Sequence, residues 1–357
     1  MPNAPDARNY TLGRGKCYFD KLDQTNSVYE GERDLGNATA VTCNTALDTL
    51  DHYTSRSGLK AKDKKVVLQI TPTIAFTLDE ISWENISLMF MADYTDVSQS
   101  ADDELSFLLD VSTYKDSQLT GNRYYSVGDY RNIGVYKLSW DGGGGGVPTR
   151  GETITGGTSS ATAEILNVMA GSTAASGTAY VKDISGTFQD DEAVTTATLT
   201  SGNLNVPTTH TYFDATSGLI FDTTDVCISD DATNAVVAAQ TTDYVVDSTS
   251  GRVLIVDGGS LDGITADYDV EFAVQALSYK KIQGFNESSI EGKFRFVPDN
   301  PVGNNMELLV HRLDLTPEGD IGLISDDWQT LSFTGEILKD ETNNPTSPYL
   351  NIITTDA

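Results

Sequence analysis

The feature that most constrains this fold is the alternation of apolar and polar residues in short segments. Residues 288–299, SSIEGKFRFVPD, place apolar side chains on one face of a strand and charged ones on the other: Ile290, Phe294, Phe296 and Glu291, Lys293, Arg295. Residues 328–338, WQTLSFTGEIL, do the same with Leu331, Phe333 and Ile337 opposite Thr330, Ser332, Thr334 and Glu336. This period of two is typical of strands buried on one side. Similar β-branched runs between turn residues recur along the chain, so we expect a mostly β fold of sandwiches or barrels.

One segment has a helical pattern instead. In residues 76–93, FTLDEISWENISLMFMAD, Thr77 and Glu80 have the spacing of a capping box, and Asp79 adds favourable charge to the first turn. The sequence therefore predicts one helix that begins after Thr77 and is packed on more than one side. Residues 102–110, DDELSFLLD, fit either a short helical turn or a strand.

Composition divides the chain. A length of 357 residues exceeds what one hydrophobic core usually supports. Five consecutive glycines at 142–146 predict a flexible tether, because the GK[ST] of a phosphate-binding loop does not follow them. We expect a first domain segment at residues 1–140, an inserted small β module at 147–205, an inserted immunoglobulin-like or similar sandwich at 206–275, and the rest of the first domain at 276–357.

Charge excludes some partners. The chain has 52 Asp plus Glu against 23 Lys plus Arg, a formal net charge of -29, which opposes binding to nucleic acid or to an anionic membrane. We expect a soluble protein made in the cytoplasm, since the sequence has no apolar signal segment and no membrane-spanning run. Against this background, five basic residues gather in one short stretch: Arg56, Lys60, Lys62, Lys64 and Lys65.

Residues suited to catalysis or metal binding are scattered. The three cysteines have no CxxC pair and are expected to be buried free thiols, and the three histidines have no metal-binding spacing. Asp326 and Asp327 beside Trp328 are the most suggestive acidic pair, but neighbours on a strand point to opposite faces. We therefore expect no enzyme, no cofactor and no metal site.

Several segments, taken in order, resemble one protein family. They are GRGKCYFDKLD (13–23), GERDLGN (31–37), LDHYTSRSGLKAKDKKVVLQ (50–69), FTLDEISWENISLMFMAD (76–93), GKFRFVPDNPVGNNMELLV (292–310) and SDDWQTLSFTGEILKD (325–340). Together they resemble the major tail tube proteins of long-tailed bacteriophages. The segment GETITGGTSSATAEI in the middle region resembles small β modules inserted in other phage virion proteins.

The resemblance implies a tail-tube-type β-sandwich or split barrel with one flanking α-helix, plus inserted β modules. It implies a structural virion protein that forms hexameric rings, which stack into a tube and conduct genomic DNA into the host. The implied partners are copies of the chain itself and other tail proteins such as the tape measure, terminator and baseplate proteins. DNA would pass without specific binding, and no membrane is involved.

The resemblance also gives the basic stretch a role. Residues 48–63 form a polar segment too long for a tight hairpin, and in the family a long loop at this place reaches the adjacent ring. We expect an inter-ring contact loop whose basic residues meet acidic surface on the next subunit, and this attraction would set the register of stacking. Its residues would be Asp51, His52, Arg56, Lys60 and Lys62. The alternative is a solvated basic loop without a partner.

Two further alternatives remain open. The polar strand face of Thr330, Ser332, Thr334 and Glu336 is a candidate for the lumen wall, and it could equally lie on the outer surface. The competing function is a secreted or cell-surface adhesin or carbohydrate-binding protein, because acidic, Thr- and Gly-rich tandem β modules are common there. The missing signal peptide and the predicted helix disfavour it.

Overall fold

The computed structural model describes residues 10–56, 58–206, 209–231, 233 and 238–355. The outer ends of the predicted first domain, residues 1–9 and 356–357, lie outside this range. Strands dominate the described residues and one α-helix accompanies them, so the prediction of a mostly β fold is confirmed. The chain divides into two compact units, unit 1 from residues up to Asp96 and from Lys280 onward, and unit 2 from Val97–Tyr279.

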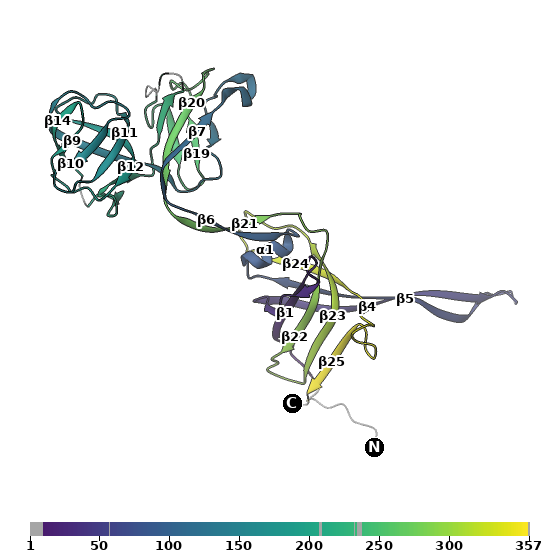
Figure 1. The fold of residues 1–357 in the computed structure, drawn as a ribbon. Coiled ribbons are helices and arrows are strands. Elements are labelled where there is room, and N and C mark those ends of the chain that lie inside the picture. Colours follow the sequence, from purple (N-terminus) through teal and green to yellow (C-terminus); the bar gives the residue numbers. More distant parts are fainter. Residues whose placement is uncertain (1–9, 57, 207–208, 232, 234–237, 356–357) are drawn as a thin grey trace. The chain divides into compact units, whose positions relative to one another are not determined.

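Unit 1 is built on one antiparallel sheet (Figure 1). Its order is β2-β1-β22-β23-β24-β5-β4, with β3 paired to β1 and β25 paired to β23. The strands are β1 (Gly15–Asp23), β2 (Val28–Tyr29), β3 (Arg33–Asp34), β4 (Ala38–Thr54), β5 (Ala61–Leu78), β22 (Ile290–Pro298), β23 (Asn305–Glu318), β24 (Leu331–Ile337) and β25 (Leu350–Thr355).

The alternating pattern of the sequence is the pattern of burial in this sheet. On β24, Leu331 and Phe333 are buried, whereas Ser332 and Thr334 are partly exposed on the other face. Phe76 of β5 stacks on Phe333 with ring centroids 5.2 Å apart, and equally on Phe294 of β22 at 5.3 Å. These rings join three strands into one core, as offset aromatic contacts commonly do.

The helix is shorter than predicted and has a different cap. Helix α1 is Trp83–Met89, and its N-cap is Ser82, whose hydroxyl accepts a hydrogen bond from the Asn85 amide at 3.2 Å. The proposed capping box is wrong, because Thr77 belongs to β5 and its hydroxyl lies 3.2 Å from that of Ser332. Pairing with β24 outweighed the local capping signal. The helix flanks the sheet and adds Leu88 and Met89 to its core.

Unit 2 contains two large hydrophobic cores, seen as two β lobes in Figure 1, and a third, smaller cluster of Val135, Leu166, Tyr180 and Cys227. One core draws on residues 109–133 and 226–274, and the other on residues 138–219. The strands are β7 (Asp102–Leu109), β8 (Arg123–Ser126), β9 (Ile133–Gly145), β10 (Thr153–Gly156), β11 (Thr162–Val168), β12 (Gly177–Ser185), β13 (Val194–Thr195), β14 (Leu199–Leu204), β15 (Phe213–Asp214), β16 (Leu219–Asp222), β17 (Cys227–Asp230), β18 (Tyr244–Asp247), β19 (Arg252–Ile255) and β20 (Tyr268–Val274).

The predicted domain boundaries need correction. Residues 97–140, assigned from composition to the first domain, lie in unit 2 because β7 pairs with β20 and β8 pairs with β19. The segments 147–205 and 206–275 are likewise parts of one compact unit. The division between the units falls within β6 (Asp93–Gln99) and β21 (Leu277–Gln283), which form a two-stranded sheet. Long-range strand pairing, which composition does not reveal, decides these boundaries.

The predicted glycine tether is also wrong. Four of its residues end strand β9, where Gly144 pairs with Ser201 and Gly145 with Leu199 of β14. A Cβ on Gly143 would overlap the carbonyl oxygen of Ala174, and Gly142 has a φ of 59° in the left-handed region. Glycine is therefore needed at these positions, because another backbone segment approaches closely and because φ is positive.

An ion cluster joins the two lobes of unit 2. Lys137 of β9 lies 2.8 Å from Asp222 and 2.6 Å from the fully buried Asp225. Tyr180 of β12 donates a hydrogen bond to Asp225 at 3.1 Å, and Tyr244 of β18, from the core of residues 109–133 and 226–274, also donates to it. Since a buried charge is tolerated only when it is paired and hydrogen-bonded, this cluster requires both lobes in place.

Two carboxylates hold the loops of the 138–219 lobe in a reciprocal arrangement. Glu152, before β10, accepts hydrogen bonds from the Thr198 amide at 3.0 Å and from the Thr149 hydroxyl at 2.7 Å. Glu192, before β13, accepts from the Ser159 amide at 2.9 Å and the Gln189 amide at 2.8 Å. Because β10 and β13 pair antiparallel, each glutamate holds the loop that follows the other strand.

These bonds predict that the lobe loses stability in acid. Burial opposes ionisation of Glu152, but hydrogen bonds from Thr196, Thr198 and Thr149 outweigh it and lower its pKa from 4.5 to about 2. A lowered folded-state pKa stabilises the fold above about pH 4.5, and this contribution is lost as the pH falls toward 2. Glu152→Gln should cost about 2 kcal/mol at pH 7, as expected for charge-assisted bonds.

Calorimetry of the full chain between pH 7 and pH 2.5 measures this effect. The variant should unfold at a lower temperature at pH 7, and its difference from the parent protein should shrink in acid. Glu164→Gln is the control on the same lobe, because its 3.8 Å ion pair with Lys182 is solvent-accessible and contributes little. Equal unfolding temperatures for Glu152→Gln and the parent at pH 7 would contradict the assignment.

Candidate functional site

The most distinctive feature of unit 1 is a long β-hairpin, which we call the arm: residues 46–54 of β4, residues 61–71 of β5, and the turn between them. Its strands pair from Leu47 with Ile70 to Thr54 with Ala61, whereas β24 pairs only with residues 73–78 of β5. Residues 61–72 of β5 therefore extend beyond the part of the sheet where β5 lies between β24 and β4. At about 3.3 Å per residue, this extension is about 40 Å long. The polar loop predicted at residues 48–63 is therefore mostly strand (Figure 1).

The arm exposes apolar side chains on both faces. Alternation along β4 puts Leu47 and Tyr53 on one face and Leu50 on the other, and all are more than half exposed. Leu59 in the turn is 81% exposed. The other exposed apolar residues of the arm are Val66, Val67, Leu68 and Ile70. A two-stranded ribbon is marginally stable alone in water, and exposed apolar surface of this extent is typical of interaction sites.

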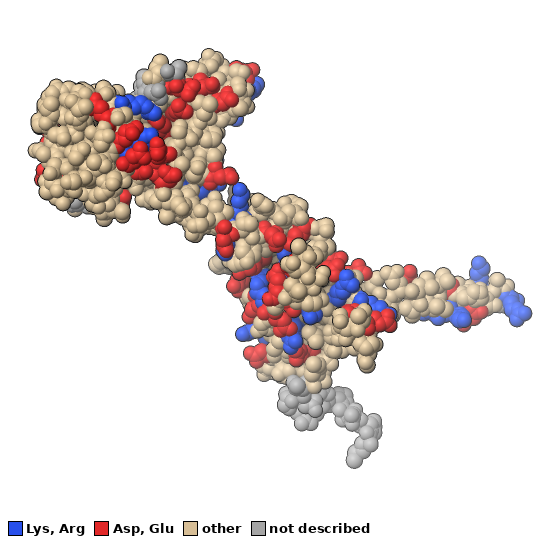
Figure 2. All heavy atoms as spheres, in the orientation of Figure 1, with Lys and Arg blue, Asp and Glu red and all other residues tan. Residues whose placement is uncertain are grey.

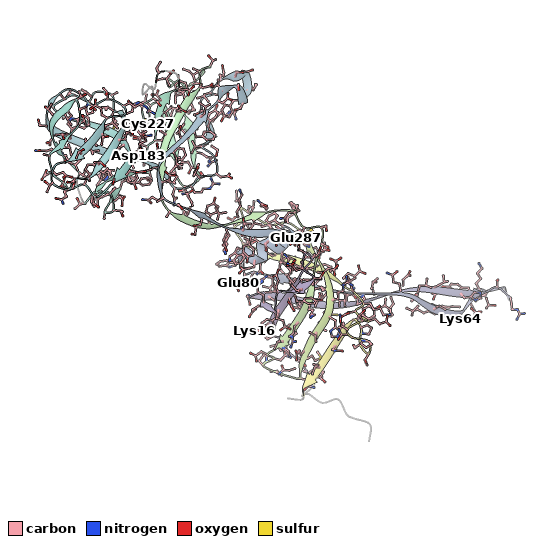
Figure 3. All side chains as sticks on the ribbon, in the orientation of Figure 1. Lys16, Lys64, Glu80, Asp183, Cys227 and Glu287 are labelled. Atoms are coloured by element: carbon pink, nitrogen blue, oxygen red, sulfur yellow. The ribbon has the colours of Figure 1, made fainter. Side chains whose placement is uncertain are left out.

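The predicted contact residues all lie on the arm. Asp51 and Lys62 form an ion pair at 2.5 Å across the strands. His52 Nδ1 lies 2.5 Å from Asp63 Oδ1. Arg56 lies in the turn and Lys60 directly before β5, both exposed, and among the described residues neither forms an ion pair. Figure 2 shows Lys and Arg side chains gathered on the arm, and Figure 3 places Lys64 there.

Strand β4 is also an open sheet edge. Within the described residues it pairs with β5 on one side and with no strand on the other. From Thr42 to Asp48 every residue is exposed. A long edge of unpaired backbone groups is a template for another strand, and proteins usually cover or interrupt such an edge.

A second exposed apolar surface lies between β23 and β24, in residues 319–330, which we call the Trp328 loop. Ile324 is 99% exposed and Trp328 is 95% exposed, and Leu323 is similarly open. Asp326 and Asp327 lie in this loop and not on a strand as assumed. This surface was not predicted from the sequence, where Trp328 stands out only as a neighbour of that acidic pair.

The predicted polar strand is part of a wider polar face. Ser332, Thr334 and Glu336 lie on β24, and Thr330 precedes the strand. Their neighbours in register are small or acidic: Thr73, Ala75 and Thr77 on β5, Ala40, Thr42 and Asn44 on β4, and Asp314, Thr316 and Glu318 on β23. Burial and the nearby Glu291 and Glu336 raise the pKa of Asp314, as crowding of acidic groups does. None of these strand positions carries a cation.

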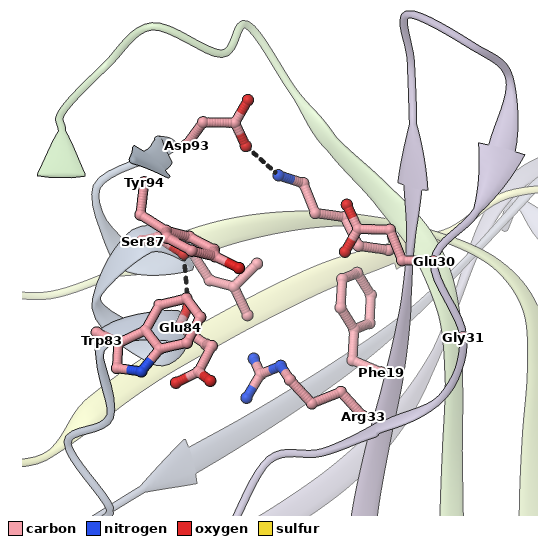
Figure 4. A pocket seen from close by; sticks show the side chains of 11 residues that line it. Phe19, Glu30, Gly31, Arg33, Trp83, Glu84, Ser87, Asp93 and Tyr94 are labelled. Atoms are coloured by element: carbon pink, nitrogen blue, oxygen red, sulfur yellow. Dashed lines mark hydrogen bonds and ion pairs between the residues drawn. The ribbon is translucent and has the colours of Figure 1, made fainter. Parts of the chain in front are cut away.

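A cavity of about 390 Å³ lies beside helix α1 (Figure 4). Trp83 and Glu84 of the helix face Phe19 of β1 and Arg33 of β3 across it. Arg33 donates a hydrogen bond to Asn85 at 3.0 Å, and Lys21 is paired with Asp93 at 3.2 Å and with Glu287 at 2.7 Å. Both cations of the cavity thus have partners within unit 1, and the lining favours no single class of ligand.

Metal-binding groups, membrane-spanning helices and paired cysteines would indicate other classes of function. Within that part of the chain, no three His, Cys, Asp or Glu side chains form a group able to hold a metal ion. No helix in the same range has the length and apolar character needed to cross a membrane. The cysteines are free; Cys17 and Cys227 are buried as expected, but Cys43 on β4 is exposed. The expectation that the chain is not an enzyme stays a prediction.

Comparison with known proteins places the chain in a family. A family model described as "Protein of unknown function UCP028589" matches residues 10–106 and 142–353, which include the arm, the open edge and the Trp328 loop. No curated protein matches the chain. Because the family model covers well over half of the sequence, this chain belongs to the family "Protein of unknown function UCP028589".

Proposed function

We propose that this protein is the structural subunit of a bacteriophage tail tube, in which hexameric rings stack and conduct genomic DNA into the host. The observation that carries the proposal is the unpaired edge of β4, which continues into an arm with exposed apolar side chains. The sequence resemblance to major tail tube proteins supports it. The protein would be made in the host cytoplasm and function in the virion.

The open edge supports closure by copies of the same chain. Backbone donors and acceptors along β4 are satisfied when a strand of the adjacent subunit pairs with them, so that six sheets close into one barrel. A closed barrel has no edge, which removes the tendency of a single subunit to aggregate without order. The same edge on every copy favours a ring over an irregular assembly.

The arm supports contact between rings. It extends about 40 Å beyond its own sheet, so we place its partner surface on a subunit of the adjacent ring. Exposed Leu50, Tyr53 and Leu59 would be buried in such a contact, which supplies affinity. Exposed Arg56 and Lys60 would steer the encounter with acidic surface and fix the register.

The polar face supports a role as the lumen wall. Duplex DNA has one charge per roughly 1.7 Å of axis, and a wall with exposed cations would retain it by counterion release. The small and acidic side chains around Ser332, Thr334 and Glu336 offer no such attraction. Only charges within about 8 Å of the DNA matter at physiological salt, so this face is more relevant than the net charge of the chain.

Other tail proteins would contact the two ends of the tube. Tape measure, terminator and baseplate proteins are the expected partners, because rings at the ends leave their stacking surfaces free. Unit 2 has its own cores and is bounded by the paired strands β6 and β21. We assign it to the outside of the tube, as expected of an inserted unit.

Electron microscopy of the purified full chain tests the proposed function. We expect rings or tubes with a central channel at high protein concentration. Isolated particles at every concentration and salt tested would contradict the proposal and would favour an adhesin or carbohydrate-binding protein instead.

Neutralising the tip of the arm should affect growth and not folding. The triple variant Arg56→Ala, Lys60→Ala, Lys62→Ala removes three exposed cations, so the monomer should remain folded while tube growth slows at least tenfold or stops. Light scattering followed by microscopy at physiological salt measures growth. Lys115→Ala, Arg123→Ala, Lys339→Ala removes the same charge elsewhere and should grow normally; equal growth of both variants would refute the role of the arm.

Cations on the polar face should trap DNA. We expect tubes of Ser332→Lys, Thr334→Lys, assembled with short duplex DNA, to retain it at low salt and release it as salt rises. Wild-type tubes should retain little. Ser112→Lys, Thr200→Lys adds the same charge at exposed positions of unit 2 and serves as the control. Co-sedimentation of DNA with tubes is the measurement, and equal retention by the two variants would argue against a lumen-facing position.

A further inference from the structure

The tip of the arm and the Trp328 loop lie at opposite ends of the same sheet. Strand β5 begins next to the tip at Ala61 and ends at Leu78. Leu331, the first residue of β24, pairs with Leu78, so the Trp328 loop that precedes β24 lies at the far end of β5. The whole length of β5, about 60 Å at 3.3 Å per residue, separates the two surfaces. They therefore do not meet within one chain.

The two surfaces are chemically complementary. The tip, residues 56–65, contains five basic residues and one acidic residue, with the exposed Leu59 among them. The Trp328 loop with the preceding Glu318 contains Asp320, Asp326 and Asp327 and no basic residue. Both surfaces have accessible apolar side chains, and the positive charge of the tip is opposite to the negative charge of the loop. Buried apolar contacts at the centre and ion pairs at the rim are the usual composition of a specific interface.

The Trp328 loop has local structure that suits docking. Gln329 donates a side-chain hydrogen bond to the Gly322 carbonyl at 2.5 Å, and the Asp327 amide donates to the Ser325 hydroxyl at 3.0 Å. Ile321 packs on the core of unit 1. These contacts hold the loop while Leu323, Ile324 and Trp328 stay exposed, and a tryptophan in this setting is a frequent anchor of binding energy.

We propose that the Trp328 loop of one copy is the docking surface for the arm tip of a second copy of this chain. This inference rests on the proposed function and names the acceptor that stacking requires. Donor and acceptor are different surfaces at opposite ends of a sheet, so the contact is head-to-tail and repeats without closing on itself. Such a contact makes rings stack into a tube of open length, while the β4 edge closes each ring.

Charge reversal with restoration tests the proposal. In the arm variant, Arg56→Glu, Lys60→Glu, and in the loop variant, Asp326→Lys, Asp327→Lys, the substituted side chains have the same sign of charge as the residues they would face, and the net charge of the substituted surface falls to zero. We expect tube growth to fall at least tenfold in each. A chain that carries all four substitutions regains opposite charges and should recover growth. Asp141→Lys, Asp257→Lys changes the charge of unit 2 by the same amount and should grow normally. Circular dichroism and thermal unfolding of the monomers confirm folding.

A spectroscopic measurement checks the contact itself. Trp328 is 95% exposed in the single chain, so its fluorescence should shift to shorter wavelength on assembly. The shift should be absent in Trp328→Phe, in which only Trp83 and Trp140 remain.

The outcomes separate the two proposals. Normal tubes from the loop variant, or failure of the four-substitution chain to recover, would overturn the docking surface and leave the tail tube function standing. A wild-type chain that stays monomeric under all conditions overturns both.

Discussion

The unpaired backbone of β4 is the constraint on which the rest of this structure depends. A strand of 17 residues lies at the edge of the sheet in unit 1, and its outer half continues into the arm with no core behind it. Exposed apolar side chains have an unfavourable free energy in water that a second surface removes, and unpaired backbone groups along a sheet edge are a template for a further strand. In the proposed assembly, the β4 edge pairs with a neighbouring copy to close the ring, and the arm buries its apolar side chains on the Trp328 loop of another copy.

Unit 2 follows a different principle, since its lobes are held together internally. The Lys137 cluster with Asp222 and Asp225, and the pair of Arg150 with Glu271 at 2.7 Å, join segments that are far apart in sequence. The paired strands β6 and β21 bring both ends of the unit together, which is the geometry that allows an insertion without disturbing the host sheet. The family model covers residues 142–353 as well as 10–106, so most of unit 2 is a family feature and not a peculiarity of this chain.

The candidate site was only partly visible in the sequence. Basic residues at 56–65 were visible as a charge cluster, because that property is local. Their position at the tip of a hairpin was not, because the strands of the arm are placed by cross-strand pairing, as Asp51 is with Lys65. The Trp328 loop went unnoticed since exposure of an apolar residue depends on which strands cover it. A local sequence pattern indicates which secondary structure a residue favours. Whether that residue is buried depends on strands from distant parts of the chain that cover it.

The sequence by itself determined the mostly β class and the buried faces of β22 and β24, because alternation is a property of one strand and needs no partner. Tertiary structure alone decided where the helix begins, why residues 142–146 are glycine, and that residues 97–140 belong to unit 2. In each of these cases pairing with a distant strand outweighed the local signal: Thr77 with Ser332, Gly144 with Ser201, and β7 with β20. The stabilisation from ladder hydrogen bonds and burial adds up along a whole strand, whereas a helix cap contributes about 1 kcal/mol. Strand pairing therefore prevails over the local signal.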